Sequence, residues 1–388
     1  MTEKEFLSRR DFLKKVVLAG TGISLGCYGL SQLFRESTHS SKPGDSHELN
    51  PWKWSKEGYH YTTLGEHVKC QVCPNECVLK EGGRSVCRNK TNYQGTLYTL
   101  AYGNPCAVHI DPVEKKPLFH FLPSTATFSV ATAGCNFRCL NCQNWEISQR
   151  GPQAGDGNLF PEDVVVKAAE SDCLSVAYTY SEPTAWYEYM YDTSKLAAHN
   201  RIKNIWVTNG YMNEKPLRDL CQYLDAANVD LKSFREEIYN TLNRGKLEPV
   251  LTTLKTLKDE GVWVEVTTLV IPTWTDDMEM ITEMCQWLYE NLGPDYPLHF
   301  SRFYPAHKLL NLPPTPYETL EKARRVALDS GLHHVYIMNV PGSEGQNTYC
   351  PHCEKVIIER KGFLVTKMHV EEGICGYCGN KVEGVWNL

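Results

Sequence analysis

The sequence has no excess of positive charge, no long apolar run, and no glycine-rich nucleotide-binding motif after its first expected strand. Its 388 residues carry 40 Lys and Arg against 46 Asp and Glu, a net charge of −6, so no global basic field draws nucleic acid to it. The apolar stretch from Val16 to Leu30 is too short to span a bilayer comfortably. Gly-x-Gly-x-x-Gly does not follow the first strand, which argues against a doubly wound dinucleotide-binding fold.

Cysteine, by contrast, is abundant. The chain has 16 Cys, and eleven of them fall in three short-spaced groups, a pattern that favours metal binding over a disulfide scaffold. The other five are scattered, and we expect core or surface thiols there: Cys27, Cys106, Cys173, Cys221 and Cys285. Because 42% of the residues are hydrophobic, we expect one large domain with small appendages.

The most informative group reads Cys135-x3-Cys139-x2-Cys142 and follows a β-prone stretch, Thr127 to Thr132. Ordinary ferredoxin-type sites supply four Cys to a 4Fe–4S cluster, whereas three thiolates leave one iron open to a ligand that is not protein. No fourth Cys lies near Cys142. The alternatives are loop thiols without metal or part of a zinc site, but zinc ligands usually come as paired Cys-x2-Cys knuckles. The pattern therefore predicts a cluster with an open iron as the catalytic centre.

A second group precedes it, with the spacing Cys-x2-Cys-x3-Cys-x9-Cys, at Cys70, Cys73, Cys77 and Cys87. Zinc and an iron–sulfur cluster both accept four thiolates, and spacing alone does not choose between them. The short Cys-rich segment, residues 56–124, can hardly bury a core of its own, so a metal is a physically sensible staple.

The third group consists of two Cys-x2-Cys knuckles in the tail, at Cys350, Cys353, Cys375 and Cys378. β-prone sequence lies between the knuckles, at Val356–Ile358 and Phe363–Val365. This pattern predicts a zinc ribbon over residues 343–388. Its expected role is structural or docking, because a zinc closed by four thiolates has no open position.

The N-terminus is expected to be a targeting segment, residues 1–34, and not part of the fold. Ser8-Arg9-Arg10-Asp11-Phe12-Leu13-Lys14 fits the twin-arginine export pattern, and the apolar run follows it. Lipidation at Cys27, a retained signal and a chance Arg-Arg pair are the alternatives. A polar linker is expected over residues 35–55. The prediction is export by the Tat route to the periplasm or membrane, with a cytoplasmic location as the alternative.

From residue 125 to 342, strand-like and helix-like stretches alternate, which predicts parallel βαβ units. The expected strands are 128–131, 174–179, 205–208, 229–231, 262–271, 298–303 and 335–340, and the expected helices are 161–169, 184–198, 214–224, 249–259, 276–289 and 315–330. Pro161 and Pro316 suit helix starts, the second with Thr315 as N-cap. Six such units fit an α/β partial (β/α)6 barrel of the TIM type.

Parallel barrels carry their chemistry at the carboxyl ends of the strands. Residues that could take part in binding or catalysis fall at these predicted ends: Cys135, Glu182, Asn209, Asp230, Lys232, Pro272, Arg302 and Asn339. This coincidence predicts an active site at that end of the sheet. His120, Glu146 and Arg302 are further candidates, for which surface or structural roles are equally open.

Three stretches carry a resemblance to a known family. A Cys-x3-Cys-x2-Cys loop after a first strand resembles the cluster loop of radical SAM enzymes. More closely, the chain resembles the radical SAM enzymes of the AmmeMemoRadiSam system, which are related to pyruvate formate-lyase activating enzymes. The residues that carry this resemblance are Asp111-Pro112-Val113-Glu114-Lys115-Lys116-Pro117-Leu118, Cys142-Gln143-Asn144-Trp145-Glu146-Ile147-Ser148 and Tyr178-Thr179-Tyr180-Ser181-Glu182-Pro183. The similarity runs from about Cys70 to the C-terminus. The family has an aromatic residue against the adenine of SAM where this chain has Asn141.

The resemblance implies which residues bind SAM beside the 4Fe–4S cluster. Tyr180, Ser181 and Glu182 occupy the place that binds the SAM amino group in the family. Asn209 falls where ribose and carboxylate contacts occur in relatives, and Asp230-Leu231-Lys232 resembles the Asp-x-Lys motif, whose Lys can pair with the SAM carboxylate. For each residue the structural alternative is a satisfied polar group at a strand end. With Asn141 in place of an aromatic, we expect an apolar side chain near 270–272 to flank the adenine.

The implied function is reductive cleavage of SAM to a 5′-deoxyadenosyl radical that abstracts hydrogen from a protein or peptide substrate. Implied partners are that substrate, an electron donor and AmmeMemo-type proteins. One alternative is activation of a glycyl radical enzyme. Another is an exported, non-enzymatic electron-transfer iron–sulfur protein, which would leave the βα repeat unexplained.

Overall fold

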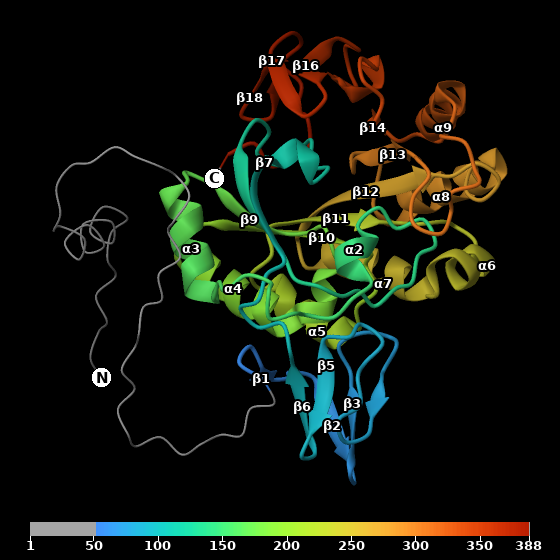
Figure 1. Ribbon diagram of the computed structural model, residues 1–388. Coiled ribbons are helices and arrows are strands. Elements are labelled where there is room, and N and C mark those ends of the chain that lie inside the picture. Colours follow the sequence, from blue (N-terminus) through green and yellow to red (C-terminus); the bar gives the residue numbers. More distant parts are fainter. Residues whose placement is uncertain (1–51, 388) are drawn as a thin grey trace, which may run out of the picture. The chain divides into compact units, whose positions relative to one another are not determined.

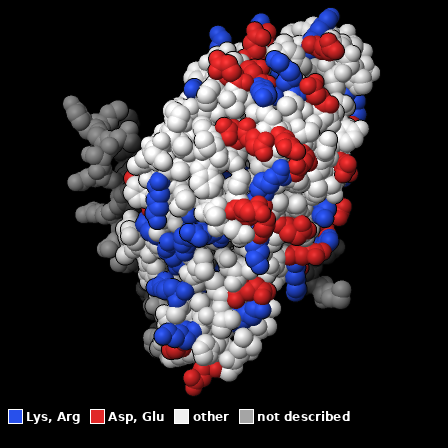
Figure 2. Space-filling model, turned by 90° about the vertical axis from the view of Figure 1, so that its right-hand side faces the viewer, with Lys and Arg blue, Asp and Glu red and all other residues white. Residues whose placement is uncertain are grey.

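The computed structural model describes residues 52–387. The predicted twin-arginine segment, most of the linker and Cys27 lie outside the described residues. Among the helices of the described part, none is both long and apolar enough to cross a membrane. The face seen in Figure 2 carries interspersed acidic and basic side chains, in keeping with the small net charge.

An eight-stranded sheet forms the centre of the described chain (Figure 1). Its strands follow one another in chain order, and neighbours from β8 to β14 pair in parallel. The parallel strands are β8 (Ala126–Ala131), β9 (Ser175–Tyr178), β10 (Lys203–Thr208), β11 (Ala226–Asp230), β12 (Trp263–Val270), β13 (Leu298–Arg302) and β14 (Val335–Met338). They are largely buried, as strands covered on both faces are. All the predicted strands are confirmed.

One strand of this sheet was missed. β7 (Ala107–Pro112) pairs antiparallel with β8 at the edge, Ala107 opposite Ala131 and Pro112 opposite Ala126. Its residues 108–110 are exposed. This short edge strand ends in Pro, and it falls within the stretch assigned to the Cys-rich segment.

Helices connect successive strands, and the predicted helices are confirmed. The structure has α2 (Trp145–Ser148), α3 (Pro161–Glu170), η2 (Pro183–Trp186), α4 (Tyr187–His199), α5 (Glu214–Cys221), α6 (Glu236–Ile238), the π-helix η3 (Tyr239–Asn243), α7 (Glu248–Asp259), α8 (Met278–Asn291) and α9 (Tyr317–Asp329). Figure 1 shows α3, α4, α5 and α7 along one face of the sheet. Their apolar sides join the strands in one large hydrophobic core.

The predicted cap of α9 is wrong. The N-cap position is Pro316, and Thr315 makes no bond to the helix. The Thr315 hydroxyl donates to the Val270 oxygen at 2.6 Å and accepts from the Phe303 amide at 3.1 Å. It ties the ends of β12 and β13 together instead of capping the helix.

Residues 52–106 form two small sheets, β1-β6-β5 and β2-β3-β4. Their strands are β1 (Lys56–Glu57), β2 (Tyr61–Leu64), β3 (His67–Cys70), β4 (Val78–Leu79), β5 (Lys90–Tyr93) and β6 (Thr96–Thr99). Val68, Val72, Leu79 and Leu97 belong to the same hydrophobic core as the strands and helices of the large sheet. The segment therefore shares its hydrophobic core with the large sheet and its helices.

The C-terminal residues form a three-stranded sheet and a short hairpin. The elements are η4 (Glu344–Gln346), β15 (Thr348–Tyr349), β16 (Val356–Lys361), β17 (Leu364–Met368), β18 (Val370–Glu371) and β19 (Ile374–Cys375). A small core of their own includes Cys350, Ile357, Ile358, Cys375 and Val382. The two β-prone stretches predicted here coincide with β16 and β17.

The amino ends of the parallel strands are covered by the chain itself. The connection from β7 to β8, which begins with η1 (Val113–Lys115), buries Leu118, Phe119 and Phe121. The Phe119 and His120 amides donate to the Glu265 carboxylate on β12 at 2.9 and 2.8 Å. His120, a candidate for the active site on sequence grounds, thus lies at the opposite end of the sheet from the Cys loop.

Candidate active site

The loop that carries Cys135, Cys139 and Cys142, here called the Cys135 loop, follows β8 directly. It lies at the carboxyl end of the parallel strands, as predicted. Gly134 has φ = 103°, and a Cβ there would overlap the backbone oxygen of Cys87, so glycine is required. On its other side the loop is held by the Arg138 and Leu140 amides. They donate to the Asn243 and Leu242 oxygens, both at 2.9 Å.

Each sulfur of this loop has a polar neighbour that can donate to a thiolate. The Phe137 amide donates to Cys135 Sγ at 3.3 Å, and Asn243 Nδ2 donates to Cys139 Sγ at 3.1 Å. The Ser148 hydroxyl lies 3.2 Å from Cys142 Sγ. These contacts suit thiolate ligands, whose charge is stabilised by hydrogen bonding.

Burial disfavours free thiolates at two of these positions. It raises the pKa of Cys135 far above its usual range, and the charge of Glu182 raises it further. It also raises the pKa of Cys139. Such thiols become anionic when a metal takes the place of the proton.

The three cysteines share one loop between β8 and α2. Thiolates of a 4Fe–4S cluster bind separate irons, and this loop can supply three of them.

Asn209 lies next to the Cys loop, as expected from the end of β10. Its Nδ2 donates to Asn136 Oδ1 at 2.8 Å and lies 3.9 Å from Cys135 Sγ. Its Oδ1 accepts from the Tyr211 amide at 2.9 Å. Asn209 and Asn136 therefore fix each other beside the first sulfur.

Glu182 also lies beside the loop, but its carboxylate oxygens already accept hydrogen bonds from other residues of the protein. Its carboxylate accepts from the Thr184 amide and hydroxyl at 3.0 and 2.7 Å, from the Thr208 hydroxyl at 2.8 Å, and from the Asn209 amide at 2.8 Å. Burial raises its pKa, and these bonds oppose the shift. The carboxylate thus joins the ends of β9 and β10. Its expected contact with the SAM amino group stays a prediction.

The two residues before Glu182 are also held by the protein. The Ser181 hydroxyl donates to the Thr132 oxygen at 2.5 Å, at the start of the Cys loop. Tyr180 has φ = 66°, and its oxygen accepts from Asn144 Nδ2 at 2.7 Å. Its hydroxyl donates to Asp111, which Lys116 also contacts at 2.6 Å. The Tyr180 side chain therefore joins the 111–118 motif to this end of the site.

Lys232 and Asp230 form an ion pair of 2.6 Å at the end of β11. Burial lowers the pKa of Lys232, but the charges of Asp230 and of Cys139 outweigh it and raise the pKa overall. The ammonium is therefore charged and lies near the second sulfur of the loop. A fixed cation there suits an anionic group of a bound ligand.

Asn141 is buried, 7% exposed, and its Oδ1 has no hydrogen-bond partner among the described residues. The adjacent Leu140 packs on an apolar cluster of Leu242, Ile271 and Phe303. Ile271 follows β12, in the stretch expected to flank the adenine. Its contact with adenine stays a prediction, and the free amide oxygen of Asn141 offers an acceptor where an aromatic ring was expected.

The remaining candidates lie outside this constellation. Glu146 is exposed on α2. Arg302 donates from Nε to the Thr315 oxygen at 2.7 Å and covers the Tyr304 ring, which indicates a structural role. The scattered thiols Cys106, Cys173, Cys221 and Cys285 are unpaired, and none of the described cysteines forms a disulfide.

Two asparagines that contact the sulfurs or their neighbours were not predicted from the sequence. Asn136 lies inside the Cys motif itself, and Asn243 ends the π-helix η3. The sequence signal for Asn243 is the following Arg244-Gly245. Arg244 has φ = 61°, and a Cβ on Gly245 would overlap the Phe137 ring. π-Helical turns of this kind are frequent at functional sites.

The C-terminal cysteines form a compact set. Cys350 and Cys378 sulfurs are 3.7 Å apart, Cys353 and Cys375 sulfurs 3.8 Å, and all four lie within 4.8 Å of one another. Four sulfurs at ~2.3 Å from one zinc in a tetrahedron are about 3.8 Å apart. The set can therefore hold a single tetrahedral metal ion.

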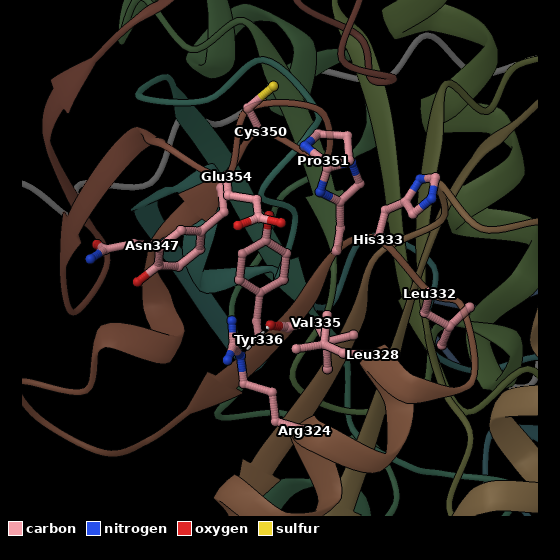
Figure 3. Close-up of a pocket in the computed structure, with 12 residues that line it drawn as sticks. Arg324, Leu328, Leu332, His333, Val335, Tyr336, Asn347, Cys350, Pro351 and Glu354 are labelled. Atoms are coloured by element: carbon pink, nitrogen blue, oxygen red, sulfur yellow. Dashed lines mark hydrogen bonds between the residues drawn. The ribbon is translucent and has the colours of Figure 1, made fainter.

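A cavity of about 430 Å³ lies away from the Cys loop, between α9, the start of β14 and the C-terminal knuckle (Figure 3). Arg324, His334, Tyr336, Tyr349 and Cys350 are among its lining residues. Burial lowers the pKa of His334 well below its usual value. The cavity belongs to the amino end of the sheet and contributes nothing to the cysteine loop.

Comparison with known proteins gives the class of this site. Residues 129–285 match the Radical SAM superfamily. The pyruvate formate-lyase 1-activating enzyme of Escherichia coli K12 is 25% identical over 150 residues, which are 37% of this chain and 61% of that protein. A radical SAM methyltransferase from Sphaerobacter thermophilus covers 72% of this chain and 78% of its own, at 12% identity and a TM-score of 0.46.

The chain therefore contains a radical SAM domain, similar in part to an activating enzyme, and it is an enzyme. This domain implies a 4Fe–4S cluster and SAM as cofactors. The chain belongs to the same family as the uncharacterized protein MJ0808 of Methanocaldococcus jannaschii. The two are 46% identical over 332 residues, which cover 84% of this chain and 99% of that protein.

Proposed function

We propose that this protein is a radical SAM enzyme of the AmmeMemoRadiSam type that acts on a protein or peptide. Cys135, Cys139 and Cys142 hold the 4Fe–4S cluster. When bound, this cluster leaves one iron for SAM and supplies the electron that cleaves SAM to methionine and a 5′-deoxyadenosyl radical. The observation that carries the proposal is the group of three sulfurs on one loop at the strand ends, each beside a polar donor.

Around this centre the chain supplies orientation. Lys232, charged and fixed by Asp230, pairs with the SAM carboxylate. Asn209 takes ribose or carboxylate contacts beside Cys135. Tyr180, Ser181 and Glu182 form the place for the SAM amino group. The side chains of Ser181 and Glu182 already make hydrogen bonds within the protein, so these residues contribute through their backbone.

The substrate class rests on two supports. The motif 111–118 and the Tyr180–Pro183 stretch match the AmmeMemoRadiSam pattern, which implies AmmeMemo-type partner proteins and an electron donor. The activating enzyme similar to this chain acts, by its name, on another enzyme. Activation of a glycyl radical enzyme is therefore the second candidate. A glycyl radical on a co-expressed partner, detected by electron paramagnetic resonance, would favour it over the first.

The same proposal divides the chain as the sequence suggests. An exported targeting segment covers 1–34 and a linker 35–55, followed by the Cys-rich segment to 124, a partial (β/α)6 barrel to 342 and a zinc ribbon from 343. The set of Cys350, Cys353, Cys375 and Cys378 then holds zinc. The first four-Cys group, Cys70, Cys73, Cys77 and Cys87, holds a second metal ion or cluster in this proposal.

Export by the Tat route is part of the proposal, because Ser8–Lys14 fits the motif and Tat carries proteins that have folded around their metal centres. SAM and low-potential electrons are cytoplasmic supplies. Either the signal is retained near a membrane electron donor, or it is vestigial and the enzyme works inside; we favour export. Replacing Arg9-Arg10 by Lys-Lys and fractionating cells tests it. The expected result is loss of the membrane or periplasmic fraction. An unchanged cytoplasmic distribution in both versions contradicts it.

The enzyme activity is tested by anaerobic reconstitution of the full chain with iron and sulfide, followed by dithionite reduction in the presence of SAM. The expected product is 5′-deoxyadenosine. Cys106→Ala serves as a matched control, since Cys106 is a half-buried thiol outside the three groups. Equal product from the chain lacking Cys135, Cys139 and Cys142 would refute the assignment.

A further inference from the structure

Asn243, at the end of the π-helix η3, contacts a sulfur of the Cys135 loop from outside that loop. Its Nδ2 donates to Cys139 Sγ at 3.1 Å, and the residue is 1% exposed. The other atom of its amide, Oδ1, is buried and has no hydrogen-bond partner among the described residues. In this part of the chain, the Cys139 sulfur is therefore the one hydrogen-bond partner of the Asn243 side chain.

The chemistry of the amide decides which of its ends faces the sulfur. The nitrogen of a side-chain amide carries two donor hydrogens, and the oxygen can only accept. An oxygen turned toward Cys139 would face the lone pairs of a metal-bound thiolate, whereas the nitrogen directs an N–H at its negative charge. A thiolate at Cys139 therefore favours the orientation that the structure has, with Nδ2 toward the sulfur.

Backbone contacts hold Asn243 in this place. Its own oxygen accepts from the Arg138 amide of the Cys135 loop at 2.9 Å. Two residues further on, a Cβ on Gly245 would lie 2.2 Å from a ring atom of Phe137, so the loop packs directly against the end of η3. The side chain of Asn243 thus approaches Cys139 from a position that the backbone fixes on both sides.

A donor at a ligand sulfur bears on electron transfer. Hydrogen bonds to the sulfurs are among the features that set the reduction potential of an iron–sulfur cluster. Reduction adds negative charge, so an N–H aimed at a sulfur stabilises the reduced form more than the oxidised form, and a buried contact does so more strongly. Asn243 is closer to its sulfur than Asn209, whose Nδ2 lies 3.9 Å from Cys135 Sγ.

We propose that Asn243 is a positioning residue that acts through Cys139 to raise the reduction potential of the cluster on the Cys135 loop. The inference rests on the proposed function, because it requires a 4Fe–4S cluster there. It goes further by giving a role in the electron-transfer step to a residue 104 positions from Cys139 in the sequence. In that step one electron passes from the reductant to the cluster, and no covalent bond of Asn243 forms or breaks.

The test is an anaerobic redox titration of the reconstituted full-length protein, followed by electron paramagnetic resonance. The signal that changes when SAM is added identifies the cluster with the open iron, whatever the N-terminal cysteines hold. Asn243→Leu keeps the size of the side chain and removes the donor. It should lower the equilibrium constant for reduction about tenfold, which is about 59 mV for a one-electron couple. Asn240→Leu, at an exposed position of the same π-helix, is the matched control and should titrate as the wild type does.

Asn243→Asp is a second variant, because its carboxylate has the shape of the amide but no N–H. It should lower the potential at least as much as Asn243→Leu, and it decides the question if Asn243→Leu holds no cluster. An unchanged potential overturns the proposal. Loss of the cluster from both variants, with Asn240→Leu unaffected, also overturns it, because Asn243 would then hold the loop rather than set the potential. A wild type without a signal that responds to SAM looks different from either result, and it refutes the proposed function together with this inference.

Discussion

Both ends of the parallel strands bury charged and polar side chains, but the two ends surround them differently. At the amino ends, Glu265 accepts from the Phe119 and His120 amides and from His299 Nε2 at 2.7 Å, so the chain bonds to itself. At the carboxyl ends, Asn209 and Lys232 lie beside the sulfurs of Cys135 and Cys139. Burial of charge alone therefore does not mark the active site, whereas adjacency to ligand atoms does.

The amino end is a structural joint between the sheet and the C-terminal segment. His120 Nδ1 donates to the Glu383 oxygen at 2.8 Å, and its Nε2 accepts from the Tyr336 hydroxyl at 2.6 Å. Arg360 donates to the Phe119 oxygen at 2.9 Å. We expect substitutions here to change stability and those at the carboxyl end to change activity.

The largest effect on stability is expected from Glu265→Gln. The buried carboxylate serves several donors, and an amide supplies a single acceptor oxygen, so the free energy of unfolding should fall by about 3 kcal/mol. Denaturant unfolding measures it. Glu260→Gln, at an exposed site, is the control and should change stability by less than about 0.5 kcal/mol. A Glu265→Gln protein of normal stability that cannot cleave SAM would contradict this, because it would place a functional residue at the amino end of the strands.

Lys232→Met is the counterpart at the carboxyl end. Loss of a charge-assisted hydrogen bond to SAM should lower the rate of 5′-deoxyadenosine formation about 10- to 100-fold and raise the KM for SAM. Cluster content should stay unchanged. Lys215→Met, on an 80% exposed side chain, is the control. Unchanged KM and rate in Lys232→Met would remove Lys232 from the SAM site.

A pH effect on stability is expected from the amino end. Burial lowers the pKa of His120 to about 3, against 6.5 for a free histidine. Between these values the unfolded chain binds a proton that the folded chain does not, so stability falls as the pH falls below 6.5. One such group contributes about 1.4 kcal/mol per pH unit, and His120→Gln should reduce the slope by that amount. Unfolding measured from pH 7 to pH 5 tests this, and an identical slope in the variant contradicts it.

The smallest effect on activity is expected from the C-terminal metal site. Cys375→Ser with Cys378→Ser should remove the proposed zinc and lower the melting temperature, because β18, β19 and the small core around Ile357 lie around this site. The rate of SAM cleavage, assayed below the new melting temperature, should change by less than about threefold. A loss of activity as large as that of Lys232→Met would make this segment part of the site.

Local patterns made the parallel strands, their connecting helices and the Cys135 loop predictable. The spacing of Cys135, Cys139 and Cys142 lies within one loop, and the strands and helices of the βα units have their own periodicity. What the sequence did not reveal depends on residues far apart in the chain. Glu265 meets Phe119 across the sheet, and Asn243 reaches Cys139 from a π-helical turn. The internal bonds of Glu182 likewise depend on Thr208, on the neighbouring strand.

The most direct test of the account is SAM cleavage by the reduced, reconstituted protein and by its C135A/C139A/C142A variant, measured as 5′-deoxyadenosine under anaerobic conditions. The account predicts product from the wild type and none above background from the variant. Product from the variant at the wild-type rate, or none from a wild type with full cluster content, would contradict it.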